Sequence, residues 1–126
     1  METTDKINEF DYIQKLYRKI ISEFPDYNVF IEKKYDKYRP DISIEFKNKV
    51  LLFEVKNSRS YSSLPFSTIL QLEDYKTNIP NSEVVLISLS SINEILQQKL
   101  NDIEIQTLVK PQFETIIDFI KKKNIT

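Results

Sequence analysis

Two acidic residues and a lysine are spaced so that one stretch of the chain can gather them at a single point. Asp41 opens an apolar segment that runs to Phe46, and Glu54 and Lys56 close a second one that begins at Val50. The second segment is almost continuously apolar, which is typical of a strand buried on both faces. Charged groups at the end of such a strand are costly unless they are paired or bind a metal. The pattern therefore indicates a polar site at the end of a buried strand.

The residues between the two apolar segments predict a β-hairpin. Two-residue turns are the commonest hairpin loops, and asparagine tolerates the positive φ that they need. A turn at Lys47-Asn48 sets Asp41 opposite Glu54. A turn one residue later sets Asp41 opposite Lys56. Because opposed residues share a face and faces alternate along a strand, either register places the three charged side chains on one face. A three-residue loop would put Asp41 on the other face unless a bulge intervened.

Pro40-Asp41 and, after a gap, Glu54-Val55-Lys56 resemble the motif of the PD-(D/E)XK nuclease superfamily, whose members have the restriction-endonuclease-like fold. In that motif the last three positions are Asp or Glu, any residue, and then Lys, at the end of an apolar strand. The resemblance implies a metal-dependent phosphodiesterase with Asp41, Glu54 and Lys56 as its catalytic residues. A structural ion-pair cluster at the end of a sheet is the alternative interpretation of these three residues.

Phosphodiester hydrolysis needs an activated water and a partner for the negative charge of the transition state. Mg²⁺ or Mn²⁺ held by two carboxylates supplies both. We expect Asp41 and Glu54 to be the ligands, together with the backbone carbonyl of Val55, and Lys56 to orient the water or hold charge near the attacking oxygen. In many superfamily members, archaeal Holliday-junction resolvases included, a glutamate on the first helix adds a metal ligand. Glu9 matches it, and a solvated flank residue is the alternative.

The composition limits the chemistry that is available. The chain has 126 residues, 40% of them hydrophobic and 29% charged, with a net charge of −1 and a pI near 5.6. The near-neutral charge argues against a generally basic nucleic-acid coat. The absence of His, Cys and Gly excludes Ser-His-Asp triads, thiolates, His or Cys metal ligands and P-loops. Any metal must have oxygen ligands, which favours Mg²⁺ or Mn²⁺.

Basic residues lie on both sides of the predicted hairpin. Lys33, Lys34 and Arg39 precede it in a segment that also contains tyrosines, and Arg59 follows it in a polar loop. Basic groups beside a metal-carboxylate site suit a phosphate backbone, and tyrosine can stack on bases. We therefore expect these residues to bind DNA, with solvated loops as the alternative.

Gln71 and Tyr75 lie four residues apart on the helix expected after the hairpin, a spacing that places them on one helix face. The pair resembles the Gln-x-x-x-Tyr motif that RecB-like members of the superfamily carry on the helix after the catalytic strand. The resemblance implies that both residues line the DNA side of the site. An amphipathic border pair is the alternative.

The remaining patterns predict an element order of α-β-β-β-α-β-α-β-α. Apolar periodicity and helix-terminal residues predict helices over 4–24, 66–79, 92–100 and 111–123, the third capped by the box Ser91–Glu94 and the last starting at Pro111. Strands are predicted over 27–34, 83–89 and 103–109, besides the hairpin. We expect one domain over 1–126 of the α/β class, a central mixed β-sheet flanked by helices as in the restriction-endonuclease-like core.

These observations predict a Mg²⁺-dependent DNA nuclease that is structure-selective or weakly sequence-specific. A Holliday-junction resolvase in particular, or a non-catalytic nucleic-acid- or partner-binding module on the same fold, are the alternatives. The RecB-like interpretation would favour single strands or ends. A homodimer is expected because cutting two strands needs two sites. With neither a signal peptide nor a long apolar run, we expect a soluble, cytoplasmic protein without membrane association.

Overall fold

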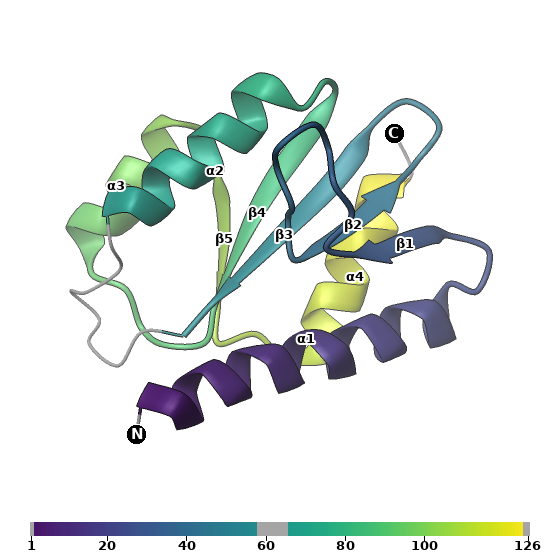
Figure 1. The fold of residues 1–126 in the computed structure, drawn as a ribbon, viewed down its shortest axis with the longest axis horizontal. Helices are drawn as coiled ribbons and strands as arrows, with labels where there is room; N and C mark the ends of the chain where they lie inside the picture. The colour runs from purple at the N-terminus through teal and green to yellow at the C-terminus, as the bar shows by residue number, and fades with distance from the viewer. Residues whose placement is uncertain (1, 58–65, 125–126) are drawn as a thin grey trace.

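A computed structural model describes residues 2–57 and 66–124, with side chains described from Glu9 onward. The chain forms one mixed β-sheet with helices packed against it (Figure 1). Its elements run in the predicted order: α1 (Glu2–Glu23), β1 (Asn28–Ile31), β2 (Ile42–Glu45), β3 (Val50–Lys56), α2 (Phe66–Asn78), β4 (Ser82–Ser88), α3 (Glu94–Asp102), β5 (Gln106–Val109) and α4 (Phe113–Asn124). The predicted fold class and element order are therefore confirmed.

The five strands form a single sheet whose spatial order equals their order in the chain. The β1–β2 and β2–β3 pairs are antiparallel, and the β3–β4 and β4–β5 pairs are parallel. The pairing changes from antiparallel to parallel at β3, as expected for a hairpin that is followed by two helical crossovers. Strand β3 is thus the central strand, and it carries Glu54 and Lys56 at its end.

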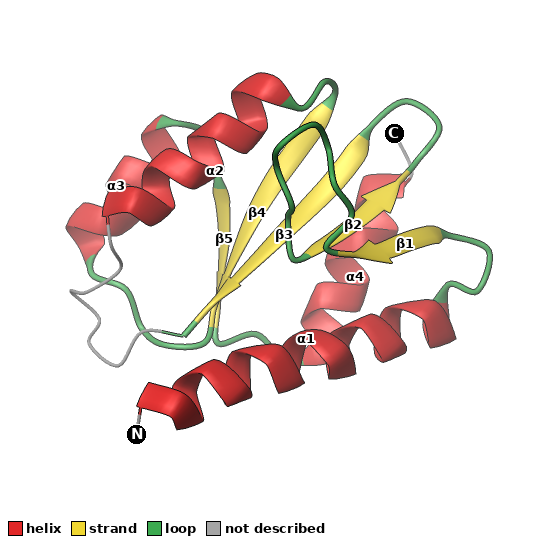
Figure 2. Ribbon diagram, in the orientation of Figure 1, coloured by secondary structure: helices red, strands yellow, loops and turns green. Residues whose placement is uncertain are grey.

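Helices cover both faces of the sheet and enclose a separate apolar cluster on each (Figure 2). Alternate residues of β3 supply the two clusters. Leu51, Phe53 and Val55 pack against α1 and α4, whereas Leu52 packs against α2 and α3. Glu54 belongs to the same face as Leu52 because side chains alternate along a strand. The candidate site therefore lies on the α2 side of the sheet.

The hairpin register matches one of the two expected arrangements. Ile42 pairs with Phe53 and Glu45 with Val50, which sets Asp41 opposite Glu54, as the turn at Lys47-Asn48 requires. The backbone N–H of Phe46 donates to the carbonyl of Lys49 at 2.8 Å across the loop. The proposed reason for this turn was wrong, however. Among the described residues, positive φ occurs only at Glu32, Asp36, Asn81, Glu104 and Lys110, so Asn48 does not use it.

Two predicted strands are shorter in the structure. Strand β1 ends at Ile31 rather than continuing to residue 34, because Glu32 adopts a left-handed φ of 52° that breaks the extended backbone. Strand β5 begins at Gln106 rather than at residue 103, because Ile103 ends α3 and Glu104 has a φ of 60°. Lys33 and Lys34 consequently lie in the loop between β1 and β2.

Two predicted helix starts were also displaced. Helix α3 is capped by Asn93, whose Oδ1 accepts a hydrogen bond from the Leu96 N–H at 2.8 Å, and not by Ser91. Helix α4 begins at Phe113, so Pro111 lies before the helix rather than at its first position. Across the described residues, no helix combines the length and apolar character that a membrane span requires.

Candidate active site

The hairpin brings Asp41 and Glu54 together just beyond the paired part of β2. The backbone N–H of Asp41 donates to Oε1 of Glu54 at 3.3 Å. In return, Oδ2 of Asp41 accepts from the backbone N–H of Val55 at 2.8 Å. Each carboxylate is thus bound to the backbone of the opposite strand, which fixes both side chains on one face.

Lys56 completes the predicted trio at the solvent edge of the sheet. Its Nζ lies 3.6 Å from Oε2 of Glu54, and its side chain is 28% exposed against 5% for Glu54. The three residues that the motif indicates therefore meet at the end of β3. One cation faces two carboxylates, so the cluster retains an excess of acidic groups.

Burial makes ionisation of both acids difficult. Burial and, after it, the charge of Asp41 together raise the pKa of Glu54 to about 8, against the opposing effects of Lys56, the Asp41 N–H and the Tyr75 hydroxyl. Burial also raises the pKa of Asp41 to about 6, although the Val55 N–H and Lys56 favour its charged form. Near neutral pH the pair thus tends to hold a proton, which a bound cation would displace.

Glu32 is an acidic neighbour of this site that the sequence analysis missed. Its charge raises the pKa of Asp41. Its backbone N–H donates to the carbonyl of Asp41 at 3.1 Å, which ties the start of the β1–β2 loop to the hairpin. In the sequence, only its position near the end of a predicted strand distinguished Glu32. The left-handed φ of its backbone could not be predicted from the residues around it.

Glu9 approaches the site from the other side of the sheet. Figure 1 shows the N-terminal half of α1 passing the end of β3, and Oε2 of Glu9 accepts from the backbone N–H of Asn57 at 2.8 Å. Its charge also raises the pKa of Asp41. Its role as a metal ligand stays a prediction, as does that of the Val55 carbonyl.

The donor set of Asp41 and Glu54 suits a hard divalent cation. Within residues 9–57 and 66–124, no group of three or more acidic side chains is placed to hold a metal ion. Mg²⁺ in proteins is usually held by only one or two carboxylates, with waters and substrate phosphate completing the shell. A buried and a half-buried carboxylate with raised pKa values, and no thiolate or imidazole in the chain, fit that requirement.

Tyr75 lies closer to the candidate site than the sequence indicated. It is only 2% exposed, and its hydroxyl lies 3.4 Å from both Oε1 of Glu54 and the carbonyl of Arg39. Gln71 donates from Nε2 to that hydroxyl at 3.0 Å, which confirms that the two residues share a helix face. A chain of polar contacts therefore runs from Gln71 on α2 through Tyr75 to Glu54.

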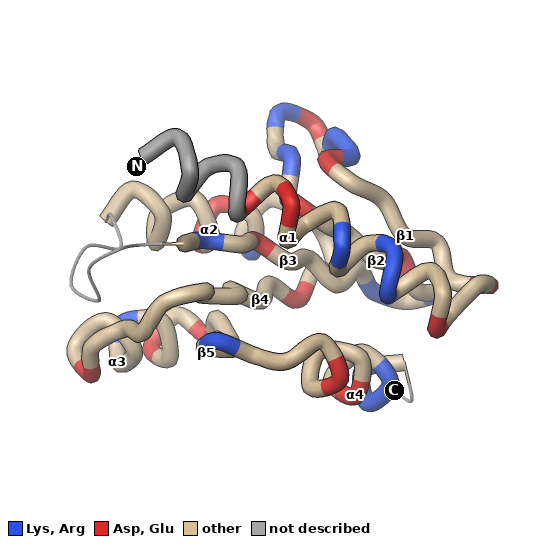
Figure 3. The backbone as a smooth tube through the Cα atoms, turned by 90° about the horizontal axis from the view of Figure 1, so that it is seen from below, with Lys and Arg blue, Asp and Glu red and all other residues tan. Residues whose placement is uncertain are grey.

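The lysine and arginine side chains predicted to bind DNA lie in different surroundings. Lys33 forms an ion pair of 2.6 Å with Glu45, and its Nζ lies 4.3 Å from the centre of the Phe30 ring. Lys34 and Arg39 are exposed on the β1–β2 loop. Figure 3 shows this loop standing away from the sheet with basic and acidic positions along it. Arg59 lies outside the described residues.

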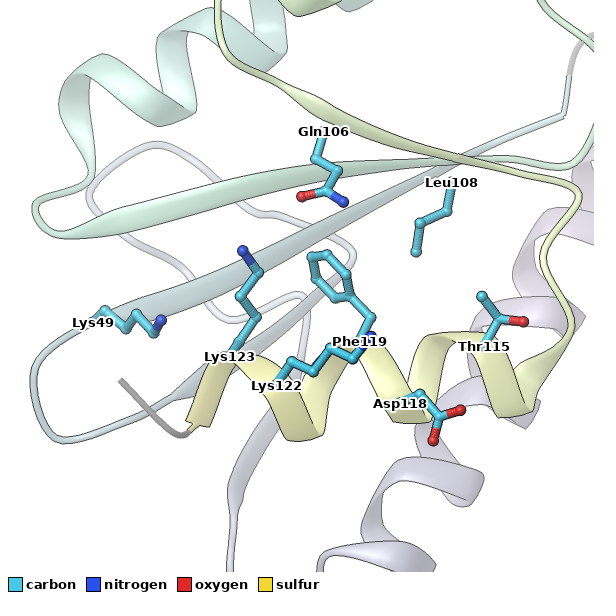
Figure 4. A pocket seen from close by; sticks show the side chains of 8 residues that line it. All are labelled: Lys49, Gln106, Leu108, Thr115, Asp118, Phe119, Lys122 and Lys123. Carbon is cyan, nitrogen blue, oxygen red and sulfur yellow. The ribbon is translucent and has the colours of Figure 1, made fainter.

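A pocket of about 510 Å³ lies on the opposite face of the sheet, between β5 and α4 (Figure 4). Lys49, at the start of β3, and Lys123, near the end of α4, are among the residues that line it. Both also pair with Glu83, at 4.0 Å and 2.5 Å respectively. None of the predicted site residues lines this pocket, so it is separate from the candidate active site.

Comparison with solved structures identifies the fold. The protein VC1899 from Vibrio cholerae matches with a TM-score of 0.66 at 10% identity, over 90% of this chain and 32% of that one. Can2 from Sulfobacillus thermosulfidooxidans, solved with cyclic tetra-adenylate, matches with a TM-score of 0.63 at 17% identity, over 89% of this chain and 34% of that one. The small subunit R.BspD6I2 of the heterodimeric restriction endonuclease R.BspD6I matches with a TM-score of 0.55 at 14% identity, over 93% and 79%.

The chain accordingly has the restriction-endonuclease-like fold, which it shares with a restriction endonuclease subunit and with Can2. It spans about a third of the length of VC1899 and of Can2. The sequence itself matches no family model and no curated protein. The likeness therefore establishes the fold, while activity has to be argued from the residues of the site.

Proposed function

We propose that the chain is a Mg²⁺- or Mn²⁺-dependent DNA nuclease whose catalytic residues are Asp41, Glu54 and Lys56. One observation carries the proposal: the half-buried carboxylate of Asp41 and the buried carboxylate of Glu54 meet at the end of the central strand, with raised pKa values and a lysine 3.6 Å from Glu54. Perturbed acids of this kind occur where a protein binds a metal or performs acid–base chemistry.

Each residue of the trio has a distinct part in phosphodiester hydrolysis. The cation, when bound, lowers the pKa of a water and offsets the charge of the phosphate. Asp41 and Glu54 would hold the cation, and the bonds that they accept from the Val55 N–H and the Asp41 N–H fix the orientation of the two carboxylates. Lys56, which is partly exposed beside Glu54, orients the attacking water and stabilises charge on the phosphate.

The proposed substrate is DNA cut with structural selectivity or weak sequence specificity. Lys34 and Arg39 are exposed on the loop that leads into Asp41, where they can contact phosphates. Cutting both strands would require a second copy of the chain, and the mass of the chain bound to a duplex, measured by analytical ultracentrifugation, tests that homodimer.

The decisive experiment is cleavage of a substrate panel in Mg²⁺ or Mn²⁺: linear duplex, single strand, supercoiled plasmid, four-way junction and RNA. Asp41→Ala should lower the rate at least about a hundredfold, because it removes half of the carboxylate pair. Asp118→Ala is the matched control, since Asp118 is exposed on α4 on the other face. Asp41→Ala cutting as fast as Asp118→Ala would contradict the proposal.

The pattern of cutting distinguishes the narrower activities. Paired symmetric cuts confined to the junction would identify a Holliday-junction resolvase, and degradation from ends would support a RecB-like exonuclease. A non-catalytic nucleic-acid- or partner-binding module on the same fold is the alternative. No cleavage of any substrate, together with no Mn²⁺ binding by calorimetry, would select that module.

A further inference from the structure

A second pocket lies directly beside the candidate active site. It measures about 510 Å³ and opens between the β1–β2 loop and α2. Tyr75 lines this pocket, and its hydroxyl also lies 3.4 Å from Glu54. A ligand in the pocket could therefore contact Tyr75, whose hydroxyl lies beside Glu54 of the carboxylate pair.

The lining of this pocket combines apolar walls, a polar edge and positive charge. Tyr38 from the loop and Leu70 from α2 provide the apolar walls, and Leu70 is 46% exposed although it is apolar. Gln71 and Asp74 add polar groups on α2, and Asp74 is the one acidic residue among the described residues of the lining. Lys37 and Arg39 bring positive charge from the loop, so the lining suits a flat, partly apolar ligand that carries a phosphate.

The walls of the pocket are held in place by contacts made without any ligand. Tyr35 and Tyr38 exchange two backbone hydrogen bonds, of 2.7 Å and 2.9 Å, that close the β1–β2 loop on itself. The Tyr35 hydroxyl donates to Oε2 of Glu45 at 2.6 Å and lies 2.9 Å from Oγ of Ser43, and both contacts anchor the loop to β2. The Tyr38 ring meets the Tyr75 ring edge to face, with centroids 5.9 Å apart. A preorganised site of this kind binds without the cost of ordering the loop.

We propose that this pocket receives an unpaired nucleobase of the strand to be cut, so that the substrate class is single-stranded DNA or a splayed nucleotide at an end or branch. The inference rests on the proposed nuclease function and adds its selectivity. A base in a duplex reaches such a pocket only after it unpairs and leaves the stack, which costs free energy, whereas an unpaired base does not have to break base pairs. Tyr38 and Leu70 contact the base, and Lys37 and Arg39 contact the flanking phosphates.

The test measures binding of 2-aminopurine-labelled oligonucleotides to the full chain, with Ca²⁺ in place of Mg²⁺ and gels to confirm that the strands stay intact. We expect the single strand to bind about tenfold or more tightly than a duplex of the same sequence, with a change of fluorescence as one base leaves its neighbours. Equal affinity for the two forms would overturn the proposal.

Leu70→Trp fills the pocket and should weaken single-strand binding about tenfold and remove the fluorescence change. Ile95→Trp is the matched control, because Ile95 is an apolar residue 72% exposed on α3. Lys37→Glu is a second variant at an exposed loop position and should weaken binding without altering the fold, which circular dichroism checks. Wild-type binding by both Leu70→Trp and Lys37→Glu would overturn the proposal.

The outcomes separate this inference from the nuclease itself. Metal-dependent cleavage that Leu70→Trp leaves unchanged on single strands and duplexes would retain the nuclease and reject the base pocket. Single-strand binding that Leu70→Trp abolishes, with no cleavage in any metal, would retain the pocket and reject the nuclease. No binding of either oligonucleotide would reject both.

Discussion

The Asp41–Glu54 pair shows how a hairpin can hold two acids where neither ionises readily. Each carboxylate accepts a hydrogen bond from the opposite backbone, which favours its charged form, yet burial outweighs these bonds and raises both pKa values. Lys56 alone does not offset two negative charges. The remaining negative charge of the pair is therefore neutralised either by a proton or by a bound cation, and the proton and the cation must compete for the site.

Metal binding should accordingly depend on pH. Because the carboxylates must lose the proton to bind a cation, the affinity for Mn²⁺ should rise as the pH increases from about 6 to about 8 and level off above that. Calorimetry at a series of pH values measures the Mn²⁺ affinity. The Glu54→Gln variant should bind Mn²⁺ weakly at every pH. An affinity that stays constant between pH 6 and pH 8 would exclude competition by this proton.

The raised pKa of Glu54 also predicts how the stability of the metal-free protein changes with pH. A carboxyl with a raised pKa binds its proton more tightly in the folded state, so stability falls as the pH rises above the ordinary value of 4.5 for Glu54 and levels off beyond about 8. Glu54→Gln keeps the shape and removes the charge, so it should exceed the wild type by about 1 kcal/mol or more at high pH. At pH 5 the two should differ little.

Urea denaturation in a chelator at both pH values measures that difference. Glu73→Gln, at an exposed position on α2, controls for the loss of a surface carboxylate. A Glu54→Gln advantage that is larger at low pH would have the opposite sign and would show that Glu54 is ionised in the folded state at low pH.

The sequence predicted the residues of the site better than their partners. Asp41, Glu54 and Lys56 could be located because a motif and the alternation of a strand fix them within one hairpin. The contact of Tyr75 with Glu54 depends on how α2 is rotated over the sheet, which local spacing does not determine. Glu32 was not singled out because the sequence placed it within a strand, which in the structure ends at Ile31.

At the scale of elements, the shared face of the hairpin was predictable, whereas the choice between its two registers and the ends of elements were not. Either two-residue turn places Asp41 on the face of Glu54, and the structure selects the turn at Lys47-Asn48. Ser91 and Asn93 are both good N-caps, and the sequence did not distinguish them. The strand limits depended on left-handed residues that are not glycine, which no local pattern marks.

The end of α3 provides a test of whether a left-handed residue other than glycine strains the backbone. The N–H of Ile105 donates to the carbonyl of Leu100 and the N–H of Glu104 to that of Asn101, both at 2.9 Å, which forms a Schellman motif with Glu104 at the left-handed position. Glycine is favoured there because it has no Cβ. Glu104→Gly should therefore stabilise the chain by about 0.5–1 kcal/mol.

Thermal denaturation measures this gain as a rise of about 2–4 °C in Tm. Glu104→Ala is the control, because it also removes the 3.2 Å ion pair with Lys76 but keeps a Cβ at the left-handed position. A Tm for Glu104→Gly no higher than that of Glu104→Ala would contradict the assigned strain. Cleavage should be the same in both variants.

At the scale of the whole molecule, the small net charge of −1 means that any attraction for nucleic acid must be local. Lys34, Lys37 and Arg39 all lie on the β1–β2 loop beside the candidate site. If these three neutralise phosphates, the logarithm of the binding constant for a single strand should fall against the logarithm of salt with a slope of about −2.

Fluorescence titrations at several salt concentrations measure this slope. Lys37→Ala should reduce its magnitude by about 0.7, the contribution of one phosphate contact on a single strand. Lys122→Ala is the control, since Lys122 is exposed on α4 on the opposite face. A slope that Lys122→Ala reduces as much as Lys37→Ala would place the nucleic acid elsewhere on the molecule.

The hairpin origin of the carboxylate pair has a consequence for how the chain folds. Asp41 and Glu54 are 13 residues apart, whereas the contact of Tyr75 with Glu54 spans 21 residues and that of Glu9 with Asn57 spans 48. Local contacts form before distant ones, so the acids meet while still in water and are covered only when α2 docks. The cost of burying two like charges then belongs to the docking of α2, and mild acid or a divalent cation should accelerate that step.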